Sequence, residues 1–190
     1  MRPLITALLG ACALPALAGA PAGIHFTHHD WEVACDNTRT CRAAGYHAED
    51  EDRLAVSVLL ERAAGPGRPV TAKLKIGTYD EKAPVPKAGS VTMHVDGRPL
   101  GQVKIDSNDM TGELSAAQTQ ALVAAVAGSG AVQWRDGGHS WALSGNGAAA
   151  VLLKMDEFQG RLGTPGALLR KGGKAENGVP AALPMPEVSP

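Results

Sequence analysis

Alternation of apolar and polar residues dominates the middle of the chain and predicts strands. Between residues 54 and 60 the apolar side chains recur at every second position, and the same period returns at 70–76 and 91–95. Because successive side chains of a strand point to opposite faces, each segment has one apolar and one polar face. Such half-buried strands are typical of antiparallel sheets.

Turn sequences indicate where these strands reverse. The dipeptide Asp96-Gly97 follows the strand at 91–95 and is a strong signal for a tight hairpin, whose second strand we place at about residues 99–105. Another hairpin is predicted within residues 132–143, where two short strands flank a glycine-rich turn. The sheet is therefore expected to be mainly antiparallel.

Two later segments change to the period of a helix. Ser115 followed by Gln118 has the form of a capping box, and the apolar face that follows ends near Gly128. A second helix is predicted over residues 148–159, with Gly160 after its end. The expected fold class is α+β: a mainly antiparallel sheet with two packed helices.

The N-terminal residues have the order of a secretory signal. One positive residue precedes an apolar run at residues 4–17, which ends in small residues. The run contains a proline and is shorter than the roughly 20 residues of a membrane-spanning helix, so we expect it to be removed. Cleavage after Ala18 is preferred, and a cut after Ala22 fits the same small-x-small rule. A lipoprotein-type cleavage box that ends at Cys12 is a third interpretation.

The cysteines indicate a disulfide. Loss of Cys12 with the signal leaves an even pair, Cys35 and Cys41. An oxidising compartment outside the cytoplasm would join them, and the polar residues 36–40 suit a tight loop between two strands. We therefore predict a hairpin tied by one disulfide. Redox catalysis is the alternative, although the Cys-x-x-Cys spacing of catalytic pairs is absent.

Composition limits the class of partner. The chain has 18 Lys and Arg against 19 Asp and Glu, a formal charge of −1, which argues against binding to nucleic acid. Its length suits one domain. We expect a signal peptide at residues 1–18, a flexible N-terminal segment at 19–30, a single α+β domain at 31–171 and a disordered tail rich in Pro, Gly and Ala at 172–190.

Two sequence blocks carry a family resemblance. Residues 31–46 read WEVACDNTRTCRAAGY and residues 152–164 read LLKMDEFQGRLGT. Together with the strand at 56–60, they resemble the domain-of-unknown-function family 1176, secreted proteobacterial proteins without an assigned activity. A looser similarity, in the Trp-x-x-x-Cys start and the strand-then-helix ending, connects the chain to the invasion-associated locus B proteins. These resemblances imply periplasmic or envelope placement.

Two groups of polar residues are candidate binding sites. The polar residues on the last predicted helix and just after its C-terminal end suit an anionic or polar ligand. A helix face that is simply exposed to solvent explains the same residues. Those on the cysteine loop are held by a rigid scaffold, although they also suit hydrogen bonds to the turn backbone. The helix candidates are Lys154, Asp156, Gln159 and Arg161, and the loop candidates are Asp36, Asn37 and Arg39.

Histidines near the predicted mature N-terminus are candidate metal ligands. His25, His28 and His29 lie beside Asp30, and neutral imidazole binds zinc, copper and nickel. A cut after Ala22 would add an amine and two amides to the imidazole of His25, a donor set that suits square-planar copper or nickel. The alternative is a flexible polar N-terminus without metal.

Recognisable catalytic motifs are missing from the sequence. It contains no Gly-x-Ser-x-Gly and no His-Glu-x-x-His. Residues 145–150 match Gly-x-Gly-x-x-Ala, but no parallel strand follows the second helix to complete a dinucleotide-binding βαβ unit. We expect these glycines to allow a tight turn and close packing instead.

The leading hypothesis is an exported periplasmic or envelope binding or interaction module with no chemistry of its own. We expect it to need no cofactor, to be monomeric, to lack a transmembrane segment, and to bind an envelope protein or a polar ligand rather than nucleic acid. One alternative is a cell-envelope hydrolase or modifying enzyme that uses dispersed Asp and His groups. The other is metal handling by the N-terminal histidines.

Overall fold

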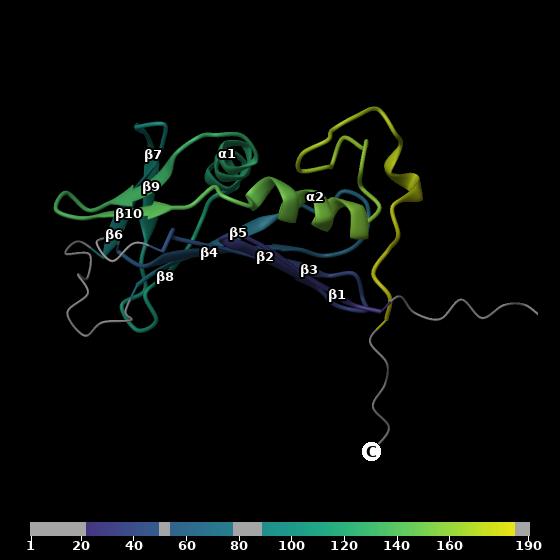
Figure 1. Ribbon diagram of the computed structural model, residues 1–190, viewed down its shortest axis with the longest axis horizontal. Coiled ribbons are helices and arrows are strands. Elements are labelled where there is room, and N and C mark those ends of the chain that lie inside the picture. The colour runs from purple at the N-terminus through teal and green to yellow at the C-terminus, as the bar shows by residue number, and fades with distance from the viewer. Residues whose placement is uncertain (1–21, 50–53, 78–88, 185–190) are drawn as a thin grey trace, which may run out of the picture.

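The structure is a computed structural model that describes residues 22–49, 54–77 and 89–184 (Figure 1). The predicted signal peptide, with Cys12 and the cleavage site after Ala18, lies outside the described residues. So do the last six residues of the predicted tail.

Six strands form an antiparallel sheet in the order β1-β2-β3-β4-β5-β8. Along β4 the side chains of Val56, Val58 and Leu60 are buried while Leu59 is exposed, which is the predicted alternation. The predicted α+β fold with a mainly antiparallel sheet is confirmed. The strands are β1 (Ile24–His28), β2 (Trp31–Cys35), β3 (Cys41–Tyr46), β4 (Val56–Arg62), β5 (Thr71–Ile76) and β8 (Thr111–Glu113).

A second, four-stranded sheet has the order β10-β9-β6-β7 and lies beside the β8 end of the large sheet (Figure 1). It consists of β6 (Ser90–Val95), β7 (Arg98–Lys104), β9 (Val132–Arg135) and β10 (Ser140–Leu143). Both predicted hairpins are present, and β6 joins them by pairing with β7 and β9. Asp96 and Gly97 have φ of 50° and 77°, as a tight hairpin turn requires.

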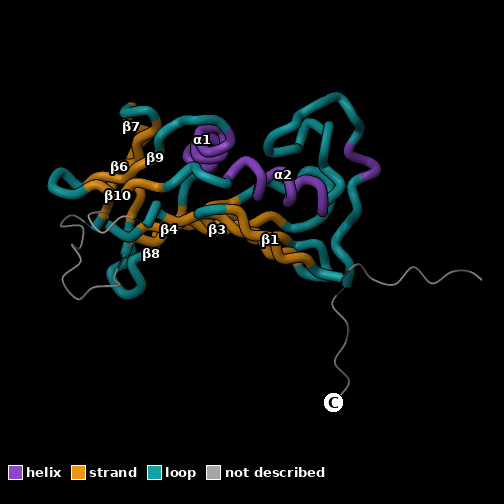
Figure 2. Tube along the Cα trace, in the orientation of Figure 1, coloured by secondary structure: helices purple, strands orange, loops and turns teal. Residues whose placement is uncertain are grey.

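Two helices cover one face of the large sheet (Figure 2). Helix α1 (Ala116–Ala127) begins at the predicted capping box, where the Ser115 hydroxyl accepts from the Gln118 N–H and the Gln118 amide oxygen accepts from the Ser115 N–H. Helix α2 (Ala148–Phe158) packs across β1, β2 and β3. None of the described helices is both long and apolar enough to cross a bilayer.

The core joins the sheet to α2 through a buried tryptophan. Trp31 on β2 is fully buried, and its indole N–H donates to the carbonyl oxygen of Ser144 at 2.7 Å, just before α2. Gly45 lies opposite Trp31 on β3, and a Cβ at this position would overlap the indole ring. Gly147 has φ of 94°, and a Cβ at this position would overlap the carbonyl oxygen of His28, so this glycine allows the close packing that was predicted.

The predicted disulfide is present. Cys35 and Cys41 are paired residues of β2 and β3, their Cα atoms are 4.0 Å apart, and their sulfurs are bonded. The bond closes the loop at residues 36–40, and Arg39 of this loop contacts Phe158, the last residue of α2.

Both ends of the described chain are more ordered than the composition suggests. The segment predicted to be flexible at 19–30 contains β1, which pairs with β2 along its whole length and half-buries Ile24 and Phe26. In the segment predicted as a disordered tail, residues 176–178 form a 3-10 turn, η1 (Glu176–Gly178), and Val179 is buried. The buried side chain of Val179 and the carboxylate of Glu176, which accepts a hydrogen bond from the Gly67 N–H, hold this C-terminal segment against the domain although it has no apolar periodicity.

Candidate functional site

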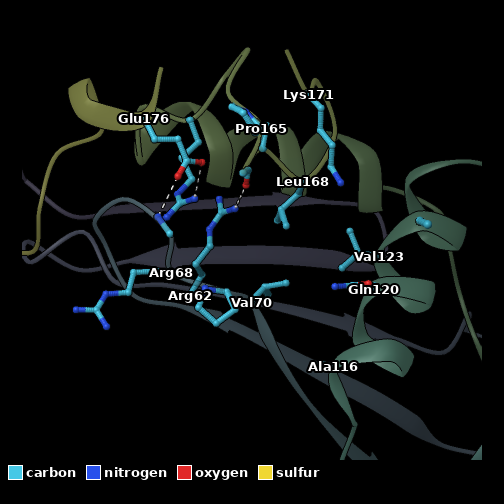
Figure 3. A pocket seen from close by; sticks show the side chains of 16 residues that line it. Arg62, Arg68, Val70, Ala116, Gln120, Val123, Pro165, Leu168, Lys171 and Glu176 are labelled. Atoms are coloured by element: carbon cyan, nitrogen blue, oxygen red, sulfur yellow. Dashed lines mark hydrogen bonds and ion pairs between the residues drawn. The ribbon is translucent and has the colours of Figure 1, made fainter. Parts of the chain in front are cut away.

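A groove of about 740 Å³ lies between α1, the loop after α2 and the turn that connects β4 to β5 (Figure 3). Val123 from α1, Leu168 from the loop and Val70 from the turn face the same space and form its apolar wall. Three segments that are far apart in sequence therefore build one concave surface.

A buried ion pair lies beneath the groove. Arg62, the last residue of β4, is 1% exposed, and its Nη2 lies 2.6 Å from Oδ1 of the fully buried Asp156 on α2. Its Nε donates to Gln159 at 2.6 Å and its Nη1 to the Gly166 carbonyl at 3.2 Å. Burial lowers the pKa of Arg62 below the ordinary arginine value, and the hydrogen bond that Arg62 donates to Asp156, with the charge of that carboxylate, offsets part of this shift. The pair locks α2 onto the sheet.

The same carboxylate positions one wall of the groove. Oδ2 of Asp156 accepts from the backbone N–H of Leu168 at 2.7 Å and of Leu169 at 3.2 Å. Because both oxygens of Asp156 are used inside the protein, this residue shapes the groove wall and does not face solvent.

The disulfide loop is tied to this network. Nε2 of Gln159 donates to the carbonyl oxygens of Arg39 at 2.8 Å and Arg62 at 2.9 Å. Arg39 in turn donates from Nη1 to the Phe158 carbonyl at 2.9 Å, and its guanidinium lies 5.6 Å from the Phe158 ring centre. The structure thus brings Arg39 of one candidate group together with Asp156 and Gln159 of the other.

A second buried arginine contacts the C-terminal segment. Arg161 is 1% exposed; its Nη2 donates to the Gly65 carbonyl, and its Nη1 lies 3.5 Å from Oε1 of Glu176. The backbone N–H of Gly67 donates to Oε2 of Glu176 at 3.0 Å. This hydrogen bond, together with the charge of Arg161, lowers the pKa of Glu176. Nε of Arg161 has no hydrogen-bond partner among the described residues.

Two exposed cations border the groove. Neither Arg68 nor Lys171 forms a side-chain ion pair or hydrogen bond with any residue that the structure describes. In Figure 3 the Lys171 side chain extends toward α1, while the Arg68 guanidinium points outward at the opposite end. Four positive side chains line the groove, and Glu176 and the underlying Asp156 neutralise two of them, so the groove carries an excess of positive charge.

Comparison with known proteins identifies the family of this chain. The model of a family described as "Protein of unknown function (DUF1176)" matches residues 25–190. The chain belongs to the DUF1176 family. This confirms the resemblance seen in the two sequence blocks.

A curated relative of this DUF1176 chain is the "Uncharacterized protein YpfG" of Escherichia coli (strain K12). It is 30% identical over 176 residues, which cover 90% of this chain and 48% of the relative, so the chain spans about half the length of that protein. No solved structure matches the chain.

Of the seven helix and loop candidates of the DUF1176 chain, Arg161 lines the groove, and Arg39, Asp156 and Gln159 belong to the network beneath it. The other three, Asp36, Asn37 and Lys154, belong to neither. Oδ1 of Asp36 accepts from the Thr38 N–H at 2.9 Å and the Thr40 N–H at 3.0 Å, so this side chain satisfies the turn backbone. Burial raises the pKa of Asp36, but these hydrogen bonds outweigh it and the net direction is downward. Asn37 is exposed, and Lys154 pairs with Glu157 at 2.8 Å on the surface of α2.

The three histidines are not gathered into one site. His25 contacts Glu32 at 3.0 Å, whereas the rings of His28 and His29 contact each other with centroids 4.4 Å apart. Within residues 22–49, 54–77 and 89–184, no group of three or more His, Cys, Asp or Glu side chains is arranged to hold a metal ion. Metal handling by His25, His28 and His29 stays a prediction.

Four charged residues of the groove lining were not predicted from the sequence: Arg62, Arg68, Lys171 and Glu176. Arg62 had a usable signal, because the alternation through Val58 and Leu60 continues to it and places a charge on the buried face of β4. A buried charge requires a partner, which here is Asp156.

Proposed function

We propose that this DUF1176 domain is an exported, periplasmic or envelope-associated binding module whose groove holds a negatively charged ligand with an apolar part. The observation that carries the proposal is the combination of Lys171 and Arg68, which have no side-chain partner among the described residues, with an apolar wall. Cations attract and orient an anion, and apolar walls bury the uncharged part of a ligand.

The walls of the groove are held in place before any ligand arrives. Asp156 fixes the Leu168 backbone, and Arg62 fixes the Gly166 carbonyl. Association is weakened when a loop must be ordered at the same time, so a wall that is already held favours binding. This supports a binding role for the groove.

The lining chemistry favours binding over hydrolysis. Among the described residues that line the groove, Glu176 is the one carboxylate, and none is His, Cys or Ser. A hydrolase that uses dispersed Asp and His groups needs an acid and a base that converge on one point. The groove therefore supports the binding hypothesis more than the envelope-enzyme hypothesis.

The disulfide supports the exported part of the proposal. Disulfides persist in oxidising compartments such as the periplasm and are rare in the cytosol. Export is tested by fractionating the native host, alkylating free thiols without reductant, and measuring the mature N-terminus by mass spectrometry. We expect a processed chain whose Cys35 and Cys41 resist alkylation. A full-length cytosolic chain with both thiols modified would refute export.

The binding part is tested with 8-anilinonaphthalene-1-sulfonate, an anionic aromatic dye that fluoresces in apolar sites. We expect saturable one-site binding to the wild-type chain. K171E replaces an attraction with a repulsion, each worth up to about 1 kcal/mol for an exposed charge, so it should weaken the affinity about tenfold.

The matched control is R135E, the same charge change at the exposed end of β9 and outside the groove lining. It should bind the dye as the wild type does, and both variants should keep the wild-type melting temperature. Non-saturable dye binding, or equal affinity of wild type and K171E, would contradict the proposal.

A further inference from the structure

The chain's own C-terminal segment already occupies one end of the groove. Glu176 in η1 receives the Gly67 N–H at 3.0 Å and lies 3.5 Å from Arg161, and Figure 3 shows both contacts as dashed lines at the Glu176 side chain. Gly67 and Glu176 are 109 residues apart in sequence. A polypeptide carboxylate is therefore a species that this end of the groove is built to accept.

Arg161 retains unused capacity for a carboxylate. It is 99% buried, it lines the groove, and its Nε has no hydrogen-bond partner among the described residues. Its 3.5 Å contact with Glu176 is also longer than the 2.7–2.9 Å that is typical of charge-assisted hydrogen bonds. Glu176 thus leaves this guanidinium only partly satisfied.

The docked segment has the character of a bound peptide. The residues that flank η1, Ala175 and Val179, have extended backbones, and Val179 is 5% exposed. An acidic side chain and a buried aliphatic side chain therefore lie three residues apart on an otherwise irregular stretch. The apolar wall and Lys171 continue the groove beyond the position of Glu176.

We propose that the ligand of the groove is an acidic segment of a partner polypeptide, and that Glu176 is an intramolecular stand-in that this segment displaces from Arg161. This inference rests on the proposed anion-binding function of the groove. The partner segment supplies a carboxylate to Arg161, an aliphatic side chain to the apolar wall and further negative charge near Lys171. Because a tethered competitor acts at an effective concentration of roughly millimolar, the chain's own segment weakens the binding of the partner.

The experiment uses the full chain and a fluorescein-labelled peptide with the sequence of residues 172–184, measured by fluorescence polarisation. We expect weak binding to the wild type. E176Q weakens the tethered competitor, so it should bind the peptide about tenfold more tightly, the effect of one charge-assisted hydrogen bond. The peptide with Gln in place of its glutamate should bind E176Q about tenfold more weakly.

The matched control is E157Q, the same chemical change at an exposed position of α2 that pairs with Lys154. It should bind the peptide as weakly as the wild type does. Equal affinities of wild type and E176Q, or of the Glu and Gln peptides, would overturn the inference. If the dye binds and K171E weakens it while the peptide fails, the proposed function stands and this inference falls; if the dye itself fails, the proposed function falls.

Discussion

Replacing Asp156 with alanine tests how the groove is held together. The carboxylate is fully buried and accepts from three donors: Nη2 of Arg62 at 2.6 Å and the N–H groups of Leu168 and Leu169. Alanine would leave the Arg62 charge buried without its counterion and two backbone donors of the loop without their acceptor.

The expected loss of stability is large. Removing one partner of a buried ion pair costs about 3–5 kcal/mol, because the remaining charge stays uncompensated. Total stabilities of single domains are about 5–15 kcal/mol, so the variant would lose a large part of its free energy of unfolding. For a domain of this size each kcal/mol shifts the melting temperature by about 2–4 °C, so we expect D156A to melt roughly 10 °C lower.

The assay is thermal and urea unfolding followed by circular dichroism, together with amide hydrogen exchange. The matched control is K154A, two residues earlier on the same helix, which removes a surface pair with exposed side chains and should change stability by less than about 1 kcal/mol. Exchange in D156A should rise first at Leu168 and Leu169. A melting temperature within about 2 °C of wild type would refute the reasoning, because that is the smallest shift expected for 1 kcal/mol.

Three further predictions concern the scaffold. The C35A/C41A variant should lose less than about 3 kcal/mol, because the disulfide closes a short loop, and hydrogen exchange should increase at residues 36–40; unchanged exchange there would contradict the coupling. G45A should lose about 1–3 kcal/mol through overlap with the Trp31 ring, while G138A in an exposed turn should change little. The lowered pKa of Glu176 stabilises the fold above the ordinary carboxyl pKa of 4.5, and this contribution disappears as pH falls through the folded-state value. The melting-temperature difference between wild type and E176Q should therefore shrink between about pH 6 and pH 3, and a constant difference would contradict the role given to Glu176.

Local patterns predicted the local structure well. The capping box at Ser115, the Asp96-Gly97 hairpin and the Cys35–Cys41 disulfide were each expected from neighbouring residues, and each is present. These features depend on interactions between residues only a few positions apart, so the sequence contains their whole cause.

Features that depend on distant partners were not predictable in the same way. Division of the strands into two sheets depends on β6 pairing with β9, some 40 residues later. The groove depends on Arg62 meeting Asp156, a separation of 94 residues. Glu176 was predicted to lie in a disordered tail, because the composition of residues 172–190 shows no apolar periodicity. Composition does not reveal that the Gly67 N–H and Arg161, far away in the sequence, bind its carboxylate. Asp156 on α2 and Gln159 just after its end were predicted to lie on a polar, ligand-binding side of the helix, but both side chains are buried. Their partners, Arg62 and the Arg39 carbonyl, are too distant in sequence to be predicted.

The binding role of the groove is tested most directly by amide NMR of the ¹⁵N-labelled chain titrated with 8-anilinonaphthalene-1-sulfonate. We expect the shifts to concentrate at residues 67–70, 120–124 and 165–171, which supply most of the groove lining, and to weaken in K171E. Shifts confined to the four-stranded sheet, or shifts that do not saturate, would contradict it.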